Sequence, residues 1–255
     1  MKLRPLAGRL LAGLALVALA LPAAAQTFTG VQKAELGGII REYLLKNPEV
    51  LQEAINELQR RTAEAEKTAQ IAAIKETGEA LMRSPHGNVV GNPSGDVTLV
   101  EFFDYNCGYC KQALADVQTL MKGDPKLRVV LKDLPVLGPD SVEASRVALA
   151  AKQQLSGDKL FDFHARLLAT RGRVGGERAL ALAKEMGLDL ARLQKDMGGA
   201  IVLAGIDENR HLSEKLGING TPAFIIGEEV IPGAVGQALL KQAIAGVRQC
   251  GRAVC

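Results

Sequence analysis

Apolar side chains recur every three or four residues between residues 31 and 82, and this spacing predicts a helical N-terminal region. Most of them form one narrow stripe, made of Ile39, Ile40, Tyr43, Leu44, Leu51, Ile55 and Leu58. The pair Asn47-Pro48 divides the region into two helices, with Asn47 as N-cap and Pro48 at the first position of the second helix. Two helices with one stripe bury little apolar surface alone, so we favour self-association over packing on the rest of the chain.

After Leu58 the stripe thins to scattered alanine and isoleucine among charged residues, which is typical of a solvated helix between two modules. A segment rich in turn residues follows over residues 78–95 and marks the entry to a larger domain. We therefore predict an N-terminal helical oligomerisation module with its linker over residues 26–82, and a main domain over residues 83–255.

The main domain opens with two largely apolar runs that show little polar alternation, Val97–Phe103 and Leu127–Leu131. Runs without polar alternation are typical of strands that are covered on both faces. Between them, residues 107–121 have helical spacing, so the segment predicts a βαβ unit.

A helical pattern broken by glycines then extends over residues 141–216, which predicts an all-helical insertion at about residues 140–217. After it, residues 223–226 and 229–231 flank Gly227-Glu228 as a hairpin, and residues 235–249 form a terminal helix. The fold class is therefore α/β, with a helical insertion and a preceding helical module.

Two cysteines, Cys107 and Cys110, stand where the first strand gives way to its helix. The free N–H groups and dipole of a helix N-terminus stabilise negative charge, so we expect Cys107 to be the accessible thiolate that attacks disulfides. Cys110, one turn later, would resolve the mixed disulfide. Two other interpretations of the pair are less favoured. A zinc site would need further ligands at suitable spacing, which the sequence lacks. A purely structural disulfide would close a loop too small to stabilise the fold much.

The N-terminus resembles an export signal. Residues 1–25 contain three basic residues, an apolar run and a small-residue end, so we predict a signal peptide cleaved after Ala25. The run is too short for a membrane-spanning helix. Cleavage would leave 28 basic and 28 acidic residues, and this balance gives no indication of binding to nucleic acid or anionic lipid. Export favours disulfide chemistry.

The order strand, C-x-x-C helix, strand, helical insertion, Thr-Pro, hairpin and helix resembles the thioredoxin fold in its DsbA-like form, over about residues 96–249. The resemblance implies that Pro222 is cis and that Thr221 and Pro222 form the substrate-binding backbone, with Gly108 and Tyr109 beside it. A cis bond is essentially a proline option, and the backbone of Thr221 stays free to pair with an extended chain. An ordinary trans proline is the alternative.

Glu101 matches the buried acid that this family places beneath its active site. A carboxyl group on a buried strand should have a raised pKa, and it would accept the proton of Cys110 during resolution. In the alternative interpretation Glu101 is simply paired, with Lys132 on the next strand as partner. We assign no catalytic step to Asp104, Tyr105 or Asn106.

The N-terminal helices, the Gly-Tyr dipeptide and the Thr before the proline are similar to the suppressor-of-copper-sensitivity C and Com1-like group. This resemblance implies a homo-oligomer, most simply a trimer, formed through residues 31–60. Cys250 and Cys255 lie outside the core motif, and export favours a disulfide between them. The expected chemistry requires no cofactor, and we assign no metal.

Together these features predict a periplasmic thiol-disulfide oxidoreductase, with isomerase or reductase activity favoured. Its clients would be cysteine-containing exported proteins, and a membrane redox partner would reset the Cys107–Cys110 pair. A DsbA-like oxidase is one alternative, since redox direction depends on thiolate stabilisation. A Cu(I)-binding copper-tolerance protein is another, because two soft thiolates suit Cu(I).

Overall fold

The computed structural model describes residues 28–255 of the chain. The predicted signal peptide, residues 1–25, and its cleavage site after Ala25 lie outside this range. Within the described part, no helix combines the length and apolar character needed to cross a bilayer. The described part of the chain divides into two compact units, one that ends at Gln59 and one that comprises residues 60–255.

The first unit contains α1 (Gly30–Lys46) and the start of α2 (Glu49–Arg83). A capping box between Thr29 and Gln32 begins α1, and no residue of this helix is buried. Asn47 caps the end of α1, where its side-chain amide donates to the Tyr43 carbonyl at 2.8 Å. The break at residues 47–48 is therefore confirmed, but Asn47 ends the first helix rather than capping the second.

The apolar stripe of this unit is exposed in the single chain. Between 49% and 65% of the surface of each of these side chains is accessible: Ile39, Ile40, Tyr43, Leu51, Ile55 and Leu58. Such a contiguous apolar surface is unfavourable in water and is typical of an interaction surface.

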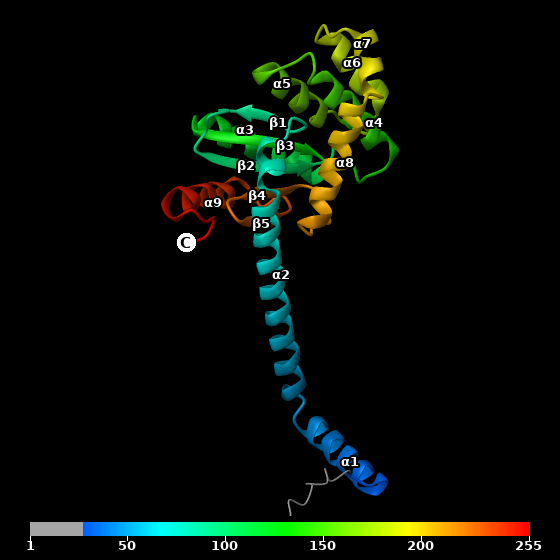
Figure 1. Cartoon of the computed structure of the whole chain (residues 1–255), viewed down its shortest axis with the longest axis vertical. Coiled ribbons are helices and arrows are strands. Elements are labelled where there is room, and N and C mark those ends of the chain that lie inside the picture. The colour runs from blue at the N-terminus through cyan, green and yellow to red at the C-terminus, as the bar shows by residue number, and fades with distance from the viewer. Residues whose placement is uncertain (1–27) are drawn as a thin grey trace, which may run out of the picture. The chain divides into compact units, whose positions relative to one another are not determined.

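A five-stranded sheet forms the centre of the second unit (Figure 1). Its order is β1-β3-β2-β4-β5. The strands are β1 (Asn88–Gly91), β2 (Val97–Phe103), β3 (Leu127–Asp133), β4 (Ala223–Ile226) and β5 (Glu229–Pro232). Only β2 and β3 pair in parallel, and they are connected by α3 (Gly108–Gly123), which confirms the βαβ unit. Strand β1 was not predicted, because it lies within the turn-rich segment.

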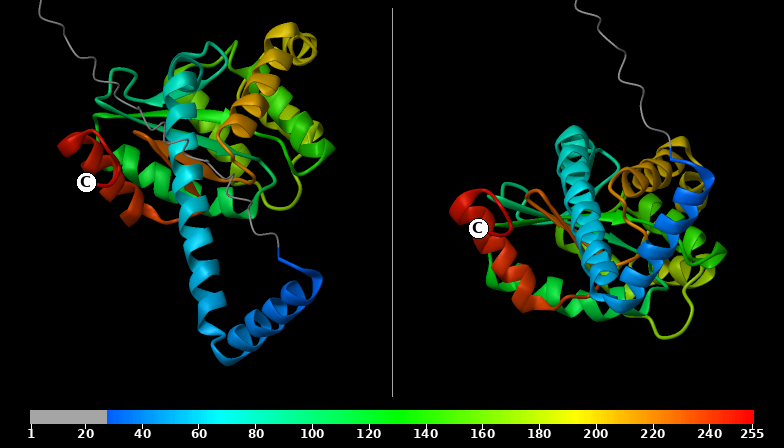
Figure 2. Two further views of the ribbon diagram at one scale, coloured as in Figure 1. Left: turned by 60° about the horizontal axis from the view of Figure 1, so that its bottom comes forward. Right: turned by 90° about the horizontal axis from the view of Figure 1, so that it is seen from below.

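Helices cover both faces of the sheet (Figures 1 and 2). Because side chains alternate along β2, Leu99 and Phe103 pack on α3 and on α9 (Gln237–Cys250). Val100 and Phe102 point the other way, toward α2 and α8. The insertion is helical as predicted and consists of α4 (Pro139–Ala151), α5 (Gly157–Leu168), α6 (Gly176–Glu185), α7 (Leu190–Met197) and α8 (Ala200–Lys215).

The second half of α2 belongs to the second unit, which differs from the predicted solvated linker. Ala73, Ile74 and Leu81 are buried against the face of the sheet that carries Val100 and Phe102. The predicted boundary at residues 82–83 therefore moves to residue 60, where the second compact unit begins. The physical reason is that three well-spaced apolar side chains suffice to dock a helix whose remaining face is charged.

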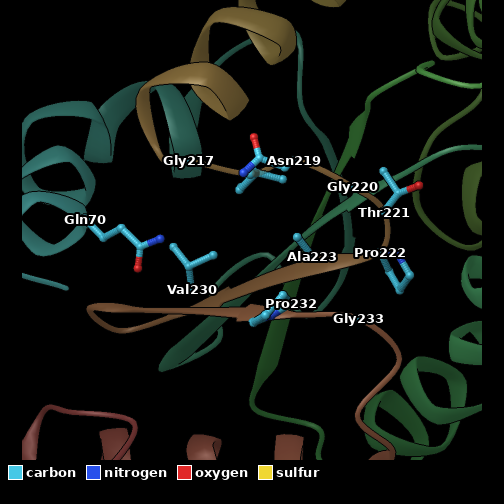
Figure 3. A pocket seen from close by; sticks show the side chains of 11 residues that line it. Gln70, Gly217, Asn219, Gly220, Thr221, Pro222, Ala223, Val230, Pro232 and Gly233 are labelled. Atoms are coloured by element: carbon cyan, nitrogen blue, oxygen red, sulfur yellow. The ribbon is translucent and has the colours of Figure 1, made fainter. Parts of the chain in front are cut away.

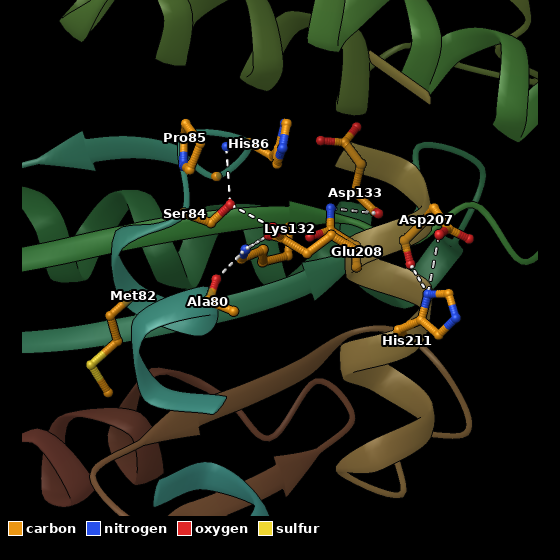
Figure 4. A network of polar contacts seen from close by, with 12 residues as sticks. Ala80, Met82, Ser84, Pro85, His86, Lys132, Asp133, Asp207, Glu208 and His211 are labelled. Atoms are coloured by element: carbon orange, nitrogen blue, oxygen red, sulfur yellow. Dashed lines mark hydrogen bonds and ion pairs between the residues drawn. The ribbon is translucent and has the colours of Figure 1, made fainter. Parts of the chain in front are cut away.

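A buried ion pair fixes the end of α2 (Figure 4). The side chain of Lys132 on β3 is fully buried, and it donates to the Ala80 carbonyl at 2.7 Å and to Glu208 of α8 at 2.9 Å. Ser84 donates to the other oxygen of Glu208 at 2.8 Å. Burial lowers the pKa of Lys132, and the bond to Glu208 acts in the opposite direction. These contacts tie α2, β3 and α8 together.

We predict that a chain beginning at Arg60 folds like the intact protein, whereas a chain beginning at Ser84 does not, because the latter exposes Val100 and Phe102. In the intact chain, Leu81→Ala should lower the free energy of unfolding by about 2–5 kcal/mol, the usual cost of truncating a buried leucine. Denaturant unfolding measures both effects. Leu239→Ala is the matched control, because Leu239 is 44% exposed; equal losses in the two leucine variants would contradict the docking of α2.

Candidate active site

Cys107 is the N-cap of α3 and holds the first turn of that helix. Its sulfur accepts a hydrogen bond from the Cys110 N–H at 3.4 Å, and its backbone N–H donates to the Asp104 carbonyl at 3.0 Å. Its thiol also donates to the Thr221 carbonyl at 3.1 Å. Both Cys107 and Cys110 are free thiols in this structure. A sulfur at this position receives the positive end of the helix dipole.

The two thiols differ in exposure. Cys107 is 6% exposed and Cys110 is 0% exposed. Cys107 is thus slightly more exposed than Cys110, but both thiols are buried in this structure, and the openly accessible Cys107 that was expected is not seen. Burial raises the pKa of the Cys110 thiol. Cys110 thus needs a nearby base before it can act as a nucleophile.

Glu101 is a buried acid on the face of the sheet that carries the active-site helix. It is 1% exposed, and burial raises its pKa to about 8. Its Oε1 has no hydrogen-bond partner within residues 28–255. The alternative of pairing with Lys132 is wrong, since Lys132 aligns with Phe102 on the other face and pairs with Glu208. An unpaired buried carboxyl is a functional candidate, because pairing does not explain it.

The Thr221-Pro222 peptide bond is cis, as expected. Pro222 immediately precedes β4, and Thr221 reaches the nucleophile through its carbonyl, as described above. The dipeptide between the cysteines lies on the surface, and Tyr109 is 68% exposed. The structure therefore brings Cys107, Thr221 and Pro222 together at one edge of α3.

Asp104 and Asn106, to which the sequence analysis assigned no step, hold the active-site turn in place. Asp104 accepts hydrogen bonds from the N–H groups of Asn106, Val136 and Leu137 at 2.8–3.0 Å, and from the Ser141 hydroxyl at 2.7 Å. The Asn106 side chain pairs with the Val174 backbone through two bonds of 2.7 and 2.8 Å.

These bonds connect the residue before the nucleophile to the helical insertion. No periodic pattern reveals such contacts, because they join segments far apart in the sequence.

Three further ionisable groups lie buried behind the active site. Asp133, the last residue of β3, is 0% exposed, neither of its oxygens has a partner within the described residues, and burial raises its pKa to about 7. Burial also raises the pKa of Tyr105, and it lowers that of His164 to about 3. The Tyr105 hydroxyl lies 3.3 Å from Nδ1 of His164. Sequence reasoning missed Asp133 because it ended this strand at Leu131.

Cys250 and Cys255 form a disulfide with an S–S distance of 2.18 Å. The bond links the end of α9 to the C-terminal tail, where Ala253 is buried against the core. Among residues 28–255, no three His, Cys, Asp or Glu side chains cluster in a way that would hold a metal ion.

A dithiol at the start of the helix after a central strand, beside a cis-proline, defines a thiol-disulfide oxidoreductase of thioredoxin fold. The chain belongs to the DSBA-like thioredoxin domain family, which matches residues 98–245. Residues 32–65 match the copper resistance protein ScsC N-terminal domain. The first match confirms the predicted fold, and the second confirms the resemblance of the N-terminal module.

Solved structures agree with both matches. A thioredoxin-like oxidoreductase from Silicibacter pomeroyi DSS-3 is 44% identical, with 68% of this chain and 98% of that chain aligned at a TM-score of 0.64. A linker-deletion mutant of Proteus mirabilis ScsC is 26% identical, with 89% of this chain and 99% of that chain aligned at a TM-score of 0.66. A periplasmic thioredoxin-like protein from Salmonella enterica serovar Typhimurium is 31% identical, with 66% of this chain and 93% of that chain aligned at a TM-score of 0.57.

Curated relatives include the Na(+)/H(+) antiporter NhaA 1 of Salinispora arenicola, which is 31% identical over 144 residues. The match covers 54% of this chain but only 21% of the antiporter. The chain thus spans about a fifth of the length of this relative.

The buried acids predict how stability depends on pH. Glu101 and Asp133 have ordinary pKa values of 4.5 and 3.8, and folding raises them to about 8 and about 7. The unfolded chain therefore loses these protons first, so the two acids should lower the free energy of unfolding of the reduced protein as pH rises, until pH exceeds 8. His164, whose pKa is lowered from 6.5, acts in the opposite direction below pH 6.5, so the fall should be steepest above that pH. Denaturant titrations at pH 5 and pH 9 measure this fall.

Glu101→Gln should reduce the fall by a few kcal/mol, because each unit of pKa shift corresponds to about 1.4 kcal/mol. The exposed Glu177 offers the matched control, Glu177→Gln, which should leave the fall unchanged. The same fall in wild type and Glu101→Gln would show that Glu101 does not ionise at a raised pKa.

Proposed function

We propose that this thiol-disulfide oxidoreductase works in the periplasm on exported proteins with wrong or unwanted disulfides, as an isomerase or reductase. The observation that supports this most directly is the difference in position and burial between the two thiols. Cys107 is the more accessible sulfur at a helix N-cap, whereas Cys110 is fully buried, and the unpaired buried acid Glu101 lies on the face of the sheet that α3 covers.

In the proposed reaction, the Cys107 thiolate attacks one sulfur of a client disulfide. The client S–S bond breaks, a mixed disulfide forms, and the other client sulfur leaves as a thiolate. In isomerisation, another client thiolate then attacks the mixed disulfide and releases Cys107. In reduction, Cys110 gives its proton to the Glu101 carboxylate and attacks the Cys107 sulfur, which releases the client thiolate and leaves a Cys107–Cys110 disulfide. A membrane redox partner would supply the two electrons that reset this pair.

Glu101 suits the role of the base. A carboxylate with a raised pKa is a stronger base than an ordinary carboxylate, and general bases work best when their pKa lies near the working pH. The burial that raises the pKa of Cys110 thus also raises the basicity of its proposed proton acceptor.

Two observations favour isomerisation over net oxidation. The dipeptide Gly108-Tyr109 brings no cation beside Cys107, so nothing in it adds to thiolate stabilisation and oxidising power. The exposed stripe of the N-terminal unit, in a segment that matches the ScsC N-terminal domain, supports a homo-oligomer, which we propose to be a trimer formed through residues 31–60. Several linked sites would hold one client while its disulfides exchange.

Copper binding is a second candidate function, because the matching N-terminal domain is described as that of a copper resistance protein. Two free thiols within one helical turn are suitable ligands for Cu(I). A Cu(I) titration of the reduced protein beside Cys107→Ser tests this candidate. Stoichiometric binding together with no refolding of a scrambled-disulfide protein would favour copper binding over exchange.

We predict that Cys110→Ala accumulates mixed disulfides with reduced or scrambled clients, because its Cys107 attacks but no resolving thiol follows. Cys107→Ala should accumulate none. Non-reducing electrophoresis after acid quenching distinguishes the two. Glu101→Gln should slow the resolution step by roughly 100-fold, the lower range for loss of a general base, and leave the first attack largely unchanged. Equal trapping by both cysteine variants would contradict the assigned roles.

We further predict that the intact mature protein is a trimer by light scattering at micromolar concentration. A chain beginning at Arg60 should be a monomer that still reduces a simple disulfide but refolds a scrambled client poorly, because its sites are no longer linked. A monomeric intact protein would contradict the oligomer. Undiminished isomerase activity of the shortened chain would instead contradict its link to function.

A further inference from the structure

A groove of about 510 Å³ lies beside the cis-proline (Figure 3). One side is the loop from α8 to β4, and another is the β5 strand with the turn that follows it. The lining residues are Gln70, Gly217, Ile218, Asn219, Gly220, Thr221, Pro222, Ala223, Val230, Pro232 and Gly233.

The groove begins at the nucleophile. Thr221 lines it, and the Thr221 carbonyl lies 3.1 Å from the Cys107 sulfur. A client segment that is bonded to Cys107 through a disulfide therefore has one end fixed at the mouth of the groove. Free backbone groups at an active-site edge pair readily with an extended chain. We accordingly take the occupant to be the client polypeptide next to its cysteine.

A further part of the lining comes from α2, through Gln70, which lies beside the start of this loop. The half-buried side chain of Gln70 points from the helix into the groove (Figure 3). Its position is fixed, because Ala73 and Ile74 in the next turn are buried against the sheet. Gln70 is the one α2 residue among the lining residues of the described chain.

The carboxamide of Gln70 has bonding capacity to spare. Its Nε2 donates one long hydrogen bond of 3.3 Å to the Leu216 carbonyl. A carboxamide has two N–H donors and a carbonyl acceptor, so one N–H and the oxygen remain for a ligand. This combination of one donor and one acceptor is complementary to a peptide group.

Charges beside Gln70 are paired within the protein. Lys67, one turn earlier, lies 3.4 Å from Glu229, and Lys75 lies 3.1 Å from Glu228. Recognition at this wall therefore depends on hydrogen bonding to the main chain rather than on client charge. Main-chain recognition suits a protein that acts on many sequences.

We propose that Gln70 is a client-binding residue, whose carboxamide binds a peptide group of the extended client segment held at Thr221 and Pro222. The inference rests on the proposed function, since it assumes a polypeptide client. It makes α2 a part of the client site as well as the connection to the N-terminal unit.

The test compares a disulfide-linked peptide with hydroxyethyl disulfide, which has no peptide group. Gln70→Ala should lower kcat/KM for the peptide by roughly three- to tenfold through KM, as expected for one hydrogen bond, and leave hydroxyethyl disulfide reduction unchanged. Gln242→Ala, which removes an exposed carboxamide from α9, is the matched control and should change neither. Unfolding midpoints of both variants verify that they fold.

A second measurement uses the peptide with Ser in place of Cys, which binds without reacting. Ester replacement of its amide groups, one at a time, should weaken binding to wild type at one position, and Gln70→Ala should abolish that sensitivity. Unchanged peptide binding and kcat/KM in Gln70→Ala would overturn the proposal, as would an equal loss on both disulfides. If wild type reduces hydroxyethyl disulfide but not the peptide, the proposed function fails, and the Ser peptide still decides the role of Gln70.

Discussion

The hydrogen bond from the Cys110 N–H to the Cys107 sulfur is the contact on which the rest of the site depends. Through this bond the nucleophile is the N-cap of its own helix. The sulfur therefore lies at the positive end of the helix dipole and also orients the first turn of the helix. The strand before it, the Asp104 hydrogen bonds and the Asn106 bonds to the insertion all fix the turn that delivers this sulfur. An error of one residue in that turn would separate Cys107 from Thr221.

Burial then sets the chemistry. The sheet excludes water from Glu101, Asp133 and Cys110, and the neutral form of each is favoured for the same reason. In the proposed reaction, the proton that leaves Cys110 would therefore go to Glu101, a group whose ordinary acidity has been suppressed. Had Lys132 pointed to this face, it would have stabilised the Glu101 carboxylate and weakened it as a base. Because side chains alternate along β3, Lys132 instead points to the opposite face of the sheet. There it pairs with Glu208 and donates to a carbonyl at the end of α2.

Local patterns sufficed for much of this fold. Largely apolar runs with little alternation located β2 and most of β3, and glycine breaks located the helical insertion, because these signals depend on neighbouring residues. The cysteine pair and the Thr-Pro dipeptide gave the two sides of the candidate site. What could not be predicted depends on contacts across the chain: the docking of α2, the strand β1, the burial of Asp133 and the Asn106–Val174 bonds. The thinning of the apolar stripe along α2 suggested that this part of the helix is surrounded by solvent. In the structure, however, Ala73, Ile74 and Leu81 are enough to bury one face of the helix against the sheet.

The docking of α2 has a consequence for how the two halves of the protein cooperate. A freely solvated linker would leave the client site the same with or without the N-terminal helices. Here the same helix carries part of the exposed apolar stripe at its start, covers the sheet with Leu81, and reaches the groove with Gln70. On the proposed function, mutations in the second half of α2 should affect stability and client contact, while those before Arg60 should affect association, so the two roles would divide within a single helix.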